Sequence, residues 1–273
     1  MPELPEVETF ARTLRPELVG KTIVAAEVRW RPTISSPSVP KFKEQIRGQE
    51  IRAVGRRAKF LVLQLSSRTL LFHLRMSGDL RILPGPLKPQ KHDRLLLELR
   101  GPPSADYERS YLVFNDTRKF GRVWLTADAN DVLGDLGPEP LGDDFTARDL
   151  YLRLHSRRRL LKPLLLDQTF LAGLGNIYTD ESLNLARLHP RARSESITPK
   201  QAERLHDAIR SILREGIRQN GSSIDWVYRG GDFQNHFRVY DREGKPCPRC
   251  GTTIRRLVVG QRSTHICPKC QKV

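Results

Sequence analysis

The sequence predicts an α+β protein with an N-terminal antiparallel β domain, a helical domain and a small metal-bound terminus. Short β-type runs fill the chain up to about Thr126, whereas apolar residues later follow a helical period. Between these regions, Gly134–Gly142 is rich in glycine and proline, which is typical of a linker. All four cysteines lie in the last 27 residues. We therefore expect domains at 1–134, 135–240 and 241–273.

The N-terminal domain begins with a predicted helix over residues 5–18. Apolar residues from Val7 to Leu14 recur at helical spacing, the first turn is acidic, and Pro16 is expected to end or kink the helix. The β-type runs that follow have no helices between them, which favours an antiparallel sandwich or barrel over a parallel sheet. These runs include Ile23–Val28, Lys59–Leu65, Leu70–Leu74, Arg94–Leu99 and Tyr111–Phe114.

The helical domain contains one well-marked helix. Thr198 is a predicted N-cap, with Pro199 at the first helical position and Gln201 at the third. Asn220-Gly221 is expected to stop the helix, and residues 222–237 to form a long, mobile loop. Between cap and stop, one apolar face is formed by Ala202, Leu205, Ala208, Ile209, Ile212, Leu213 and Ile217.

Net charge is the strongest signal in the composition. The chain carries 47 Lys and Arg against 31 Asp and Glu, a formal charge of +16. Such a surface favours a polyanionic partner, with nucleic acid ahead of an anionic membrane or simple solubility. No apolar run reaches the ~18 residues of a spanning helix, and no signal peptide is visible. We expect a cytoplasmic, nucleoid-associated protein with no membrane partner.

The cysteines predict a zinc site. Cys247-x-x-Cys250 and Cys267-x-x-Cys270 are separated by sixteen residues, and each pair can aim two thiolates at one ion. In a basic chain this spacing favours zinc over redox pairs or an iron–sulfur cluster. Four thiolates leave no open position for a reacting water, so the zinc is expected to be structural.

The first residues of the chain predict a nucleophile. A small second residue such as Pro2 lets the initiator methionine be trimmed, which leaves proline with a free secondary amine. Such an amine titrates near pH ~8 and can form an iminium with a sugar carbon. Glu3 beside it can supply a carboxyl for proton transfer. The plain alternative is a disordered end before a helix with Pro5 at its first position.

Basic and glycine-rich segments are candidates for phosphate binding. The glycines of Leu171–Tyr178 permit tight turns that expose amide donors at the next helix, although such a segment is often only a loop. From Gly244 onward there are seven Lys or Arg and no Asp or Glu. Residues 259–265, with Arg262, fall where the zinc-bound hairpin turns. Lys162, in another basic stretch, could follow a DNA backbone.

The segments His73–Gly78 and Asp116–Gly121 each end a predicted strand at a turn. They contain Met76 and Phe120, and isolated apolar residues of this kind more often belong to a core. Glycine and charged neighbours weaken that interpretation here. Excision of a base from duplex DNA requires a flipped nucleotide and side chains that fill the void it leaves.

Together the motifs resemble the formamidopyrimidine-DNA glycosylase family along the whole chain. They are Pro2-Glu3-Leu4-Pro5-Glu6-Val7, the two turns, Gly173-Leu174-Gly175-Asn176 followed by Tyr178-x-Asp180-Glu181, and the cysteine finger. The resemblance implies an N-terminal β-sandwich, a helix–two-turn–helix domain and a C-terminal β-hairpin zinc finger. It implies a monomeric DNA glycosylase and abasic-site (AP) lyase for double-stranded DNA containing oxidised purines or abasic sites, with one structural Zn2+.

The resemblance also implies a mechanism. The Pro2 nitrogen attacks C1′ of the flipped nucleoside and displaces the base, while Glu3 protonates the sugar ring oxygen. β- and then δ-elimination leave a one-nucleotide gap. Lys59 contacts phosphate and assists catalysis; the family usually has glycine before it, where Ala58 stands here. Arg262 grips the phosphates that flank the target nucleotide.

The remaining implied residues contact DNA. Met76 inserts into the void, Phe120 wedges beside the opposite strand, and Arg118 hydrogen-bonds the orphaned base. This set favours oxidised purines over the substrates of an endonuclease VIII-like pyrimidine glycosylase. That enzyme and a non-catalytic zinc-finger DNA-binding protein are the alternatives, and the preferred purine lesion stays open. With Lys162 from its basic stretch, the full set of predicted DNA contacts is Glu6, His73, Met76, Arg118, Phe120, Asn176 and Lys162.

Overall fold

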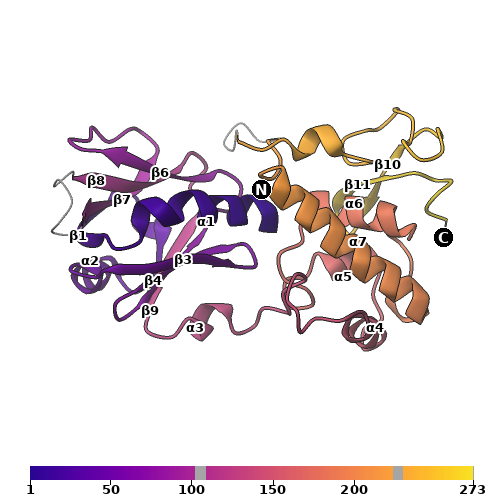
Figure 1. The fold of residues 1–273 in the computed structure, drawn as a ribbon, viewed down its shortest axis with the longest axis horizontal. Helices are drawn as coiled ribbons and strands as arrows, with labels where there is room; N and C mark the ends of the chain where they lie inside the picture. Colours follow the sequence, from indigo (N-terminus) through magenta and orange to yellow (C-terminus); the bar gives the residue numbers. More distant parts are fainter. Residues whose placement is uncertain (102–108, 224–229, 273) are drawn as a thin grey trace. The chain divides into compact units, whose positions relative to one another are not determined.

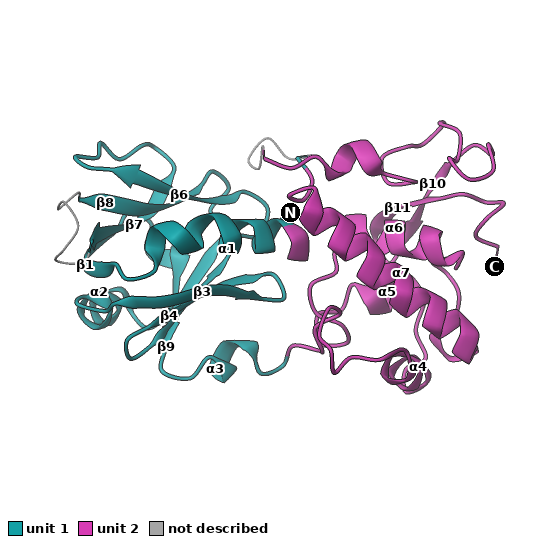
Figure 2. Ribbon diagram, viewed as in Figure 1, with its two compact units in different colours: residues 1–2, 6–135, 223–229 teal, residues 3–5, 136–222, 230–273 magenta. Residues whose placement is uncertain are grey.

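The computed structural model describes residues 1–101, 109–223 and 230–272. It divides into two compact units, coloured separately in Figure 2. Unit 1 contains Met1–Pro2 and Glu6–Asp135, and unit 2 contains Glu3–Pro5, Leu136–Ser222 and the chain from Gly230. The break at residues 135 and 136 falls inside the glycine- and proline-rich linker, as expected for a segment with little apolar content.

Unit 1 is built on two β-sheets (Figure 1). The first has the strand order β1-β7-β8-β6, and the second has the order β2-β9-β5-β4-β3. The bounds are β1 Thr22–Val28, β2 Ile34–Ser36, β3 Ile51–Arg57, β4 Phe60–Leu65, β5 Thr69–His73, β6 Gly78–Pro84, β7 Asp93–Arg100, β8 Ser110–Asp116 and β9 Arg122–Thr126. A predicted antiparallel sandwich is thereby confirmed, with the short parallel pair β2–β9 as an exception.

The core of unit 1 lies between the two sheets. Leu61, Leu63 and Leu65 alternate along β4, and their side chains meet those of Leu95 and Leu97 on β7 in one buried cluster. This alternation is the period of a strand with one face turned to a core. Rings on facing sheets also touch, since Phe72 and Phe114 lie edge to face with their centroids 5.7 Å apart.

The helices of unit 1 agree with the expectation at α1 and differ from it at α2. Helix α1 is Leu4–Leu18, within one residue of the predicted range 5–18, and it contains Pro16. Leu14 and Leu18 are both buried in the core, so packing outweighs the hydrogen bond that proline cannot make. Helix α2 (Val39–Ile46) interrupts the strand series, so the absence of intervening helices was a wrong prediction. Only Phe42 and Ile46 are buried in α2, a pattern too short to indicate a helix. Helix α3 is Asn130–Leu133 and a 3-10 turn is Arg31–Thr33.

Unit 2 is a helical body that carries a β-hairpin. Its helices are α4 Ala147–His155, α5 Leu161–Leu165, α6 Asn176–Ala186 and α7 Pro199–Arg218, with 3-10 turns at Ser194–Ser196 and Phe233–His236. The N-cap of α7 is confirmed, because the Gln201 amide nitrogen donates to Thr198 Oγ1 while the Gln201 side chain accepts from the Thr198 amide. Most of the predicted apolar face of α7 is buried in the core of the unit.

The segment 222–237 lies partly outside the described residues. Within its described part, Phe233–His236 forms a 3-10 turn, and Phe233 is fully buried. Its ring stacks on that of Tyr178 with centroids 5.1 Å apart. This part of the predicted loop is therefore anchored by an aromatic contact.

The hairpin consists of β10 (Arg255–Val259) and β11 (Arg262–Ile266). Its two-residue turn is Gly260-Gln261, and both residues have positive φ, 55° and 61°. That combination is the type I′ turn, whose twist matches the right-handed twist of the strands. The turn places Arg262 at the first position after the bend. No helix among the described residues is long and apolar enough to span a bilayer.

The cap of α7 gives a first testable prediction. Replacing Thr198 with Ala should lower the stability of α7 by about 1 kcal/mol, because the Gln201 amide loses its acceptor. Native-state hydrogen exchange of the α7 amides measures this. Lys200→Ala, on the exposed first turn of the same helix, should change it by less than about 0.5 kcal/mol. Equal effects of the two substitutions would contradict the capping role.

Candidate functional site

Glu3, the third residue of the chain, is held by the start of helix α6. Its buried carboxylate accepts hydrogen bonds from the backbone nitrogens of Gly175 at 2.6 Å and of Ile177 at 3.0 Å. The glycine-rich turn was expected to offer these amides to a DNA phosphate. The anion that occupies them is instead a side chain of the same unit, which satisfies helix-terminal donors that would otherwise lack partners.

Two glycines make this approach possible. A Cβ at Gly175 would lie 2.5 Å from Glu3 Oε1, so any larger residue would displace the carboxylate. Gly173 has a φ of +95° and accepts a hydrogen bond from the Leu4 amide at 3.1 Å, and a Cβ there would meet the Leu4 side chain. The glycines are thus required by the close passage of the N-terminal segment.

Pro2, bonded directly to Glu3, is buried, and Met1 before it is 40% exposed. With Met1 in place the Pro2 nitrogen is part of a planar amide and has no lone pair to donate. The chain as encoded therefore carries the candidate nucleophile in a blocked form, directly beside a carboxyl group of fixed orientation.

Lys162 is the clearest departure from the predicted DNA contacts. Its side chain is fully buried, and its Nζ donates to Asp180 Oδ1 at 2.6 Å, to Ser263 O at 2.9 Å and to Thr264 Oγ1 at 2.9 Å. Burial lowers the pKa of Lys162, while the Asp180 carboxylate opposes that shift. With all three ammonium protons engaged, Lys162 cannot bind a phosphate. It ties the hairpin to α5 and α6 instead.

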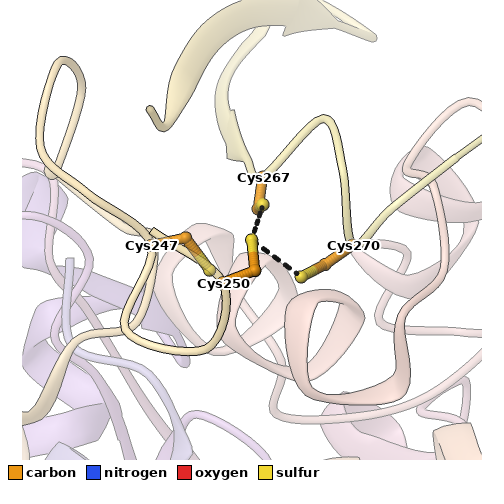
Figure 3. Close-up of side chains that lie close together, drawn as sticks. All are labelled: Cys247, Cys250, Cys267 and Cys270. Atoms are coloured by element: carbon orange, nitrogen blue, oxygen red, sulfur yellow. Dashed lines mark hydrogen bonds between the residues drawn. The ribbon is translucent and has the colours of Figure 1, made fainter. Parts of the chain in front are cut away.

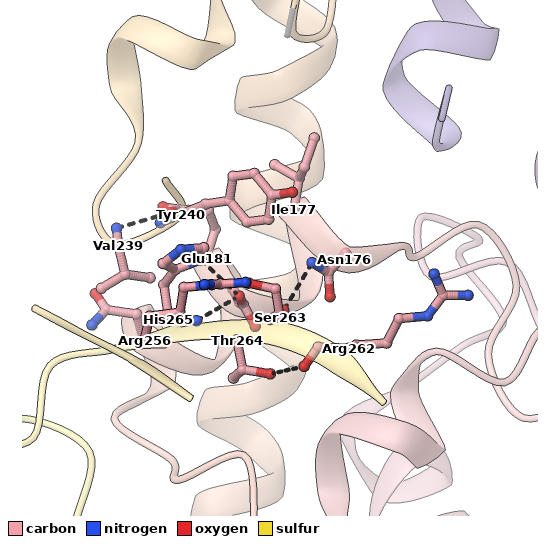
Figure 4. A network of polar contacts seen from close by, with 12 residues as sticks. Asn176, Ile177, Glu181, Val239, Tyr240, Arg256, Arg262, Ser263, Thr264 and His265 are labelled. Carbon is pink, nitrogen blue, oxygen red and sulfur yellow. Dashed lines mark hydrogen bonds and ion pairs between the residues drawn. The ribbon is translucent and has the colours of Figure 1, made fainter. Parts of the chain in front are cut away.

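Further buried groups of helix α6 bind the hairpin and the chain segment before it (Figure 4). Asp180 Oδ2 accepts from the His265 amide at 2.9 Å, and Asn176 Nδ2 donates to Ser263 O at 2.9 Å. Glu181 accepts from the amides of three consecutive residues, Arg238 to Tyr240, at 2.8–2.9 Å. These contacts were not predicted. The sequence did offer one signal for them, since Asp180 and Glu181 are adjacent acids in a helix that precedes a basic finger.

Asn176 and Arg262 both belong to the region where helix α6 contacts the hairpin. Asn176 is half-buried at the first position of α6, and one of its amide protons is used on Ser263. Arg262 is exposed, and Figure 4 shows its side chain extending away from the polar network. An exposed guanidinium on a hairpin with fixed strands is free to make bidentate contacts with phosphate oxygens.

The four cysteines come together as predicted (Figure 3). Their Sγ atoms all lie within 4.8 Å of one another, with Cys250 3.4 Å from Cys267 and 3.5 Å from Cys270. Four Zn–S bonds of about 2.3 Å in a tetrahedron place sulfurs about 3.8 Å apart, so the cluster fits one zinc ion. None of the four forms a disulfide, and Cys247 and Cys267 are buried. The site is closed by its own ligands and is therefore structural.

Known proteins match this chain along its whole length. Residues 1–123 match the formamidopyrimidine-DNA glycosylase N-terminal domain, residues 136–227 its H2TH domain, and residues 244–273 the zinc finger found in FPG and IleRS. Formamidopyrimidine-DNA glycosylase from Chloroflexus aurantiacus is 49% identical over 99% of this chain and 98% of its own. The chain belongs to the formamidopyrimidine-DNA glycosylase family.

Solved structures of the family agree. A structure of MutM in complex with DNA containing carbocyclic 8-oxo-G superposes with a TM-score of 0.90, at 35% identity and full coverage of both chains. The complex between Lactococcus lactis Fpg and DNA containing an abasic site gives a TM-score of 0.90 at 34% identity, covering 99% of this chain and 100% of that one. These likenesses confirm the predicted fold class.

The glycine that the family usually has before its lysine is Ala58 in this chain. Ala58 has a φ of +52°, the left-handed region that glycine occupies without strain, and its methyl group is buried. Lys59 is itself 5% exposed and His73 is 8% exposed. Burial, together with the charges of Arg75 and Lys59, lowers the pKa of His73 to about 3.

His73 is consequently neutral near pH 7. Its Nδ1 accepts from the Arg75 amide at 3.1 Å, so the ring proton is on Nε2. In a contact between His73 and a phosphate, the neutral ring would donate a hydrogen bond from Nε2–H. Glu6, another implied DNA contact, is 2% exposed, about as deeply buried as Lys59 and His73, and its DNA contact stays a prediction.

The two turns of the β domain present their apolar residues to solvent. Met76 is 42% exposed and Phe120 is 47% exposed, which excludes the alternative that they belong to the core. The Arg118 guanidinium lies over the Phe120 ring, 5.1 Å from its centroid. Large exposed apolar side chains on rigid turns are what a void-filling role requires.

The zinc site gives a second prediction. Cys267→Ser should release the metal and the hairpin, because binding of the ion is part of the folding energy of so small an element. Elemental analysis should fall from one zinc per chain towards none, and DNA binding should collapse while most circular dichroism remains. Ser196→Ala, an exposed serine elsewhere in unit 2, serves as the control and should change neither. If wild-type protein purified without chelator contained no zinc, the proposed zinc site would be contradicted.

Proposed function

We propose that this protein is a bifunctional DNA glycosylase and AP lyase that removes oxidised purines from double-stranded DNA. The observation that carries the proposal is the carboxyl of Glu3, the residue directly after Pro2. It is held by the backbone amides of Gly175, the N-cap residue of α6, and of Ile177 in the first turn of that helix. General acid catalysis requires a proton donor fixed in position beside the nucleophile. The family relatives named above, one bound to 8-oxo-G DNA and one to abasic-site DNA, support the same conclusion.

In the proposed reaction, removal of Met1 frees the Pro2 amine. Its nitrogen forms a bond to C1′ of the flipped nucleoside, and the N-glycosidic bond breaks with its electron pair leaving on the base. The proton that the Pro2 nitrogen then loses neutralises the departing base. Glu3 donates a proton to the sugar ring oxygen, which opens the ring and leaves an iminium on Pro2. Loss of a C2′ proton then expels the 3′ phosphate by β-elimination, and δ-elimination expels the 5′ phosphate.

We further propose roles for the residues that meet the DNA. Lys59 and Arg262 act on phosphates at the target, Asn176 contacts the lesion phosphate, and His73 donates from Nε2. Met76, Arg118 and Phe120 fill the void. This set favours oxidised purines over an endonuclease VIII-like choice of pyrimidines. We keep the division into domains at 1–134, 135–240 and 241–273 as a proposal, and place the enzyme with its DNA in the cytoplasm.

The third prediction concerns the nucleophile. Protein that retains Met1, or any N-terminal tag, should form no covalent adduct with an abasic-site duplex on borohydride reduction, because an amide nitrogen cannot form an iminium. Binding to that duplex should persist. Protein with a free Pro2, verified by mass spectrometry, is the control. A trapped adduct formed at the normal rate by Met1-retaining protein would point to an internal amine, Lys59 first.

The fourth prediction concerns Glu3. Gly175→Ala should displace the carboxyl and lower base excision by roughly 100-fold, the typical contribution of one positioned general acid. Strand cleavage at a preformed abasic site should fall less. Gly175 has an ordinary φ of −127°, so alanine adds a steric clash without backbone strain. Gly55→Ala, where a Cβ meets nothing within 4 Å, is the matched control. A normal rate of base excision by Gly175→Ala would show that the mechanism does not depend on the position of the Glu3 carboxyl.

A further inference from the structure

Two turns of unit 1 connect the same pair of sheets. Residues 74–77 lead from β5 to β6, and residues 117–121 lead from β8 to β9. The strands on either side are paired, since Gly78 on β6 lies opposite Asp116 on β8, and His73 on β5 lies opposite Arg122 on β9. The two turns therefore start and end on neighbouring strands in both sheets, and they lie beside each other at one end of the sandwich.

The turns share an unusual backbone feature. Arg75, directly before Met76, has a φ of +54°, and Lys119, directly before Phe120, has a φ of +62°. Side-chain-bearing residues occupy this left-handed region at a cost in free energy, and they remain there only where the surroundings fix them. The direction of each exposed apolar side chain is thus set by the strained residue before it. Contacts with buried groups must stabilise the strained backbone of each turn.

The carboxylate of Asp116 is bonded to both turns. Asp116 is 1% exposed, and its Oδ1 accepts a hydrogen bond from the hydroxyl of Ser77 in the first turn. In the second turn, the Arg118 amide donates to Oδ1 at 3.2 Å and the Gly121 amide donates to Oδ2 at 2.7 Å. Ser77 Oγ in turn accepts from the Arg118 amide at 3.1 Å. One buried anion therefore joins the segments that carry Met76 and Phe120.

A steric constraint acts at the same place. The ring of Phe114 fills the space beneath both turns, so that a Cβ at Gly78 would lie 2.9 Å from it and a Cβ at Gly121 would overlap it. The backbone of Asp116 is also fixed, since its carbonyl accepts from Arg94 Nε at 2.7 Å. The two turns rest on one ring and one carboxylate, and neither can shift without disturbing the other.

We propose that Asp116 and Ser77 are positioning residues that couple the two turns into one rigid unit, so that Met76, Arg118 and Phe120 enter the DNA void together. The inference rests on the proposed function and deepens it. A carboxylate suits the task because both of its oxygens only accept, and here they face amide and hydroxyl donors from both turns. An asparagine of the same shape must turn an NH2 group towards one of those donors.

The test compares Asp116→Asn and Ser77→Ala with a matched control, Asp93→Asn. Asp93 is an equally buried aspartate of the same sheet, 1% exposed, and it accepts from Arg81, the Gln90 amide and Asn115. It contacts neither turn through these bonds. Ser77→Ala is the more selective variant, because it removes the link to the first turn and leaves the Gly121 bond to Asp116 intact.

The primary measurement is the ratio of affinities for a duplex with a tetrahydrofuran abasic analogue and for the same duplex undamaged. Both turn variants should lower this preference by about 10-fold, the size expected for loss of a charge-assisted hydrogen bond. Asp93→Asn should lower it by less than about 3-fold. Strand cleavage of a single-stranded abasic oligonucleotide, which has no void, should stay near wild type in all three.

A double-mutant cycle tests the coupling itself. In the wild-type background, Met76→Ala and Phe120→Ala should be non-additive in this preference, and in the Asp116→Asn background they should become additive. An unchanged preference, persisting non-additivity or an equal loss with Asp93→Asn overturns the inference. Excision of 8-oxoguanine and of formamidopyrimidines by wild-type protein is measured separately, and the absence of both would refute the proposed function while the binding ratio still decides the coupling.

Discussion

Helix α6 buries ionised groups, and much of the geometry of unit 2 depends on how their hydrogen bonds are satisfied. A buried charge is tolerated only when it is paired and its remaining donors or acceptors are used. Lys162 meets that condition with Asp180, Ser263 and Thr264, and Asp180 meets it with Lys162 and the His265 amide. Breaking one contact would leave another charge unpaired, so the hairpin has one favourable position on the helix.

The same helix organises the chemistry at its other end. Its free N-terminal amides bind the Glu3 carboxylate, while Asn176 at its first position reaches the hairpin strand that begins with Arg262. Helix α6 therefore positions both Glu3, the acid proposed for base excision, and the strand that carries Arg262, the arginine proposed for phosphate binding. Rigid support of this kind is how a protein holds reacting groups within a fraction of an ångström.

Unit 1 reaches a similar result by a different route. Its two sheets close over an apolar core, and the turns at one end are shaped by Asp116 and Phe114. The exposed residues Met76 and Phe120 gain nothing from burial in the free protein. Their positions are determined by strained and buried neighbours, which is the arrangement expected where a surface acts on a ligand rather than on its own core.

The sequence by itself determined the elements and motifs that depend on local pattern. The capping box at Thr198, the alternation in the strands and the spacing of Cys247 to Cys270 each act over a few residues, so each could be predicted. Tertiary structure decided what depends on partners distant in sequence. Only packing shows that Lys162 is buried among finger residues and that Glu3 takes the amides expected to bind phosphate. In each case the burial of a group, which no local pattern encodes, outweighed its intrinsic preference.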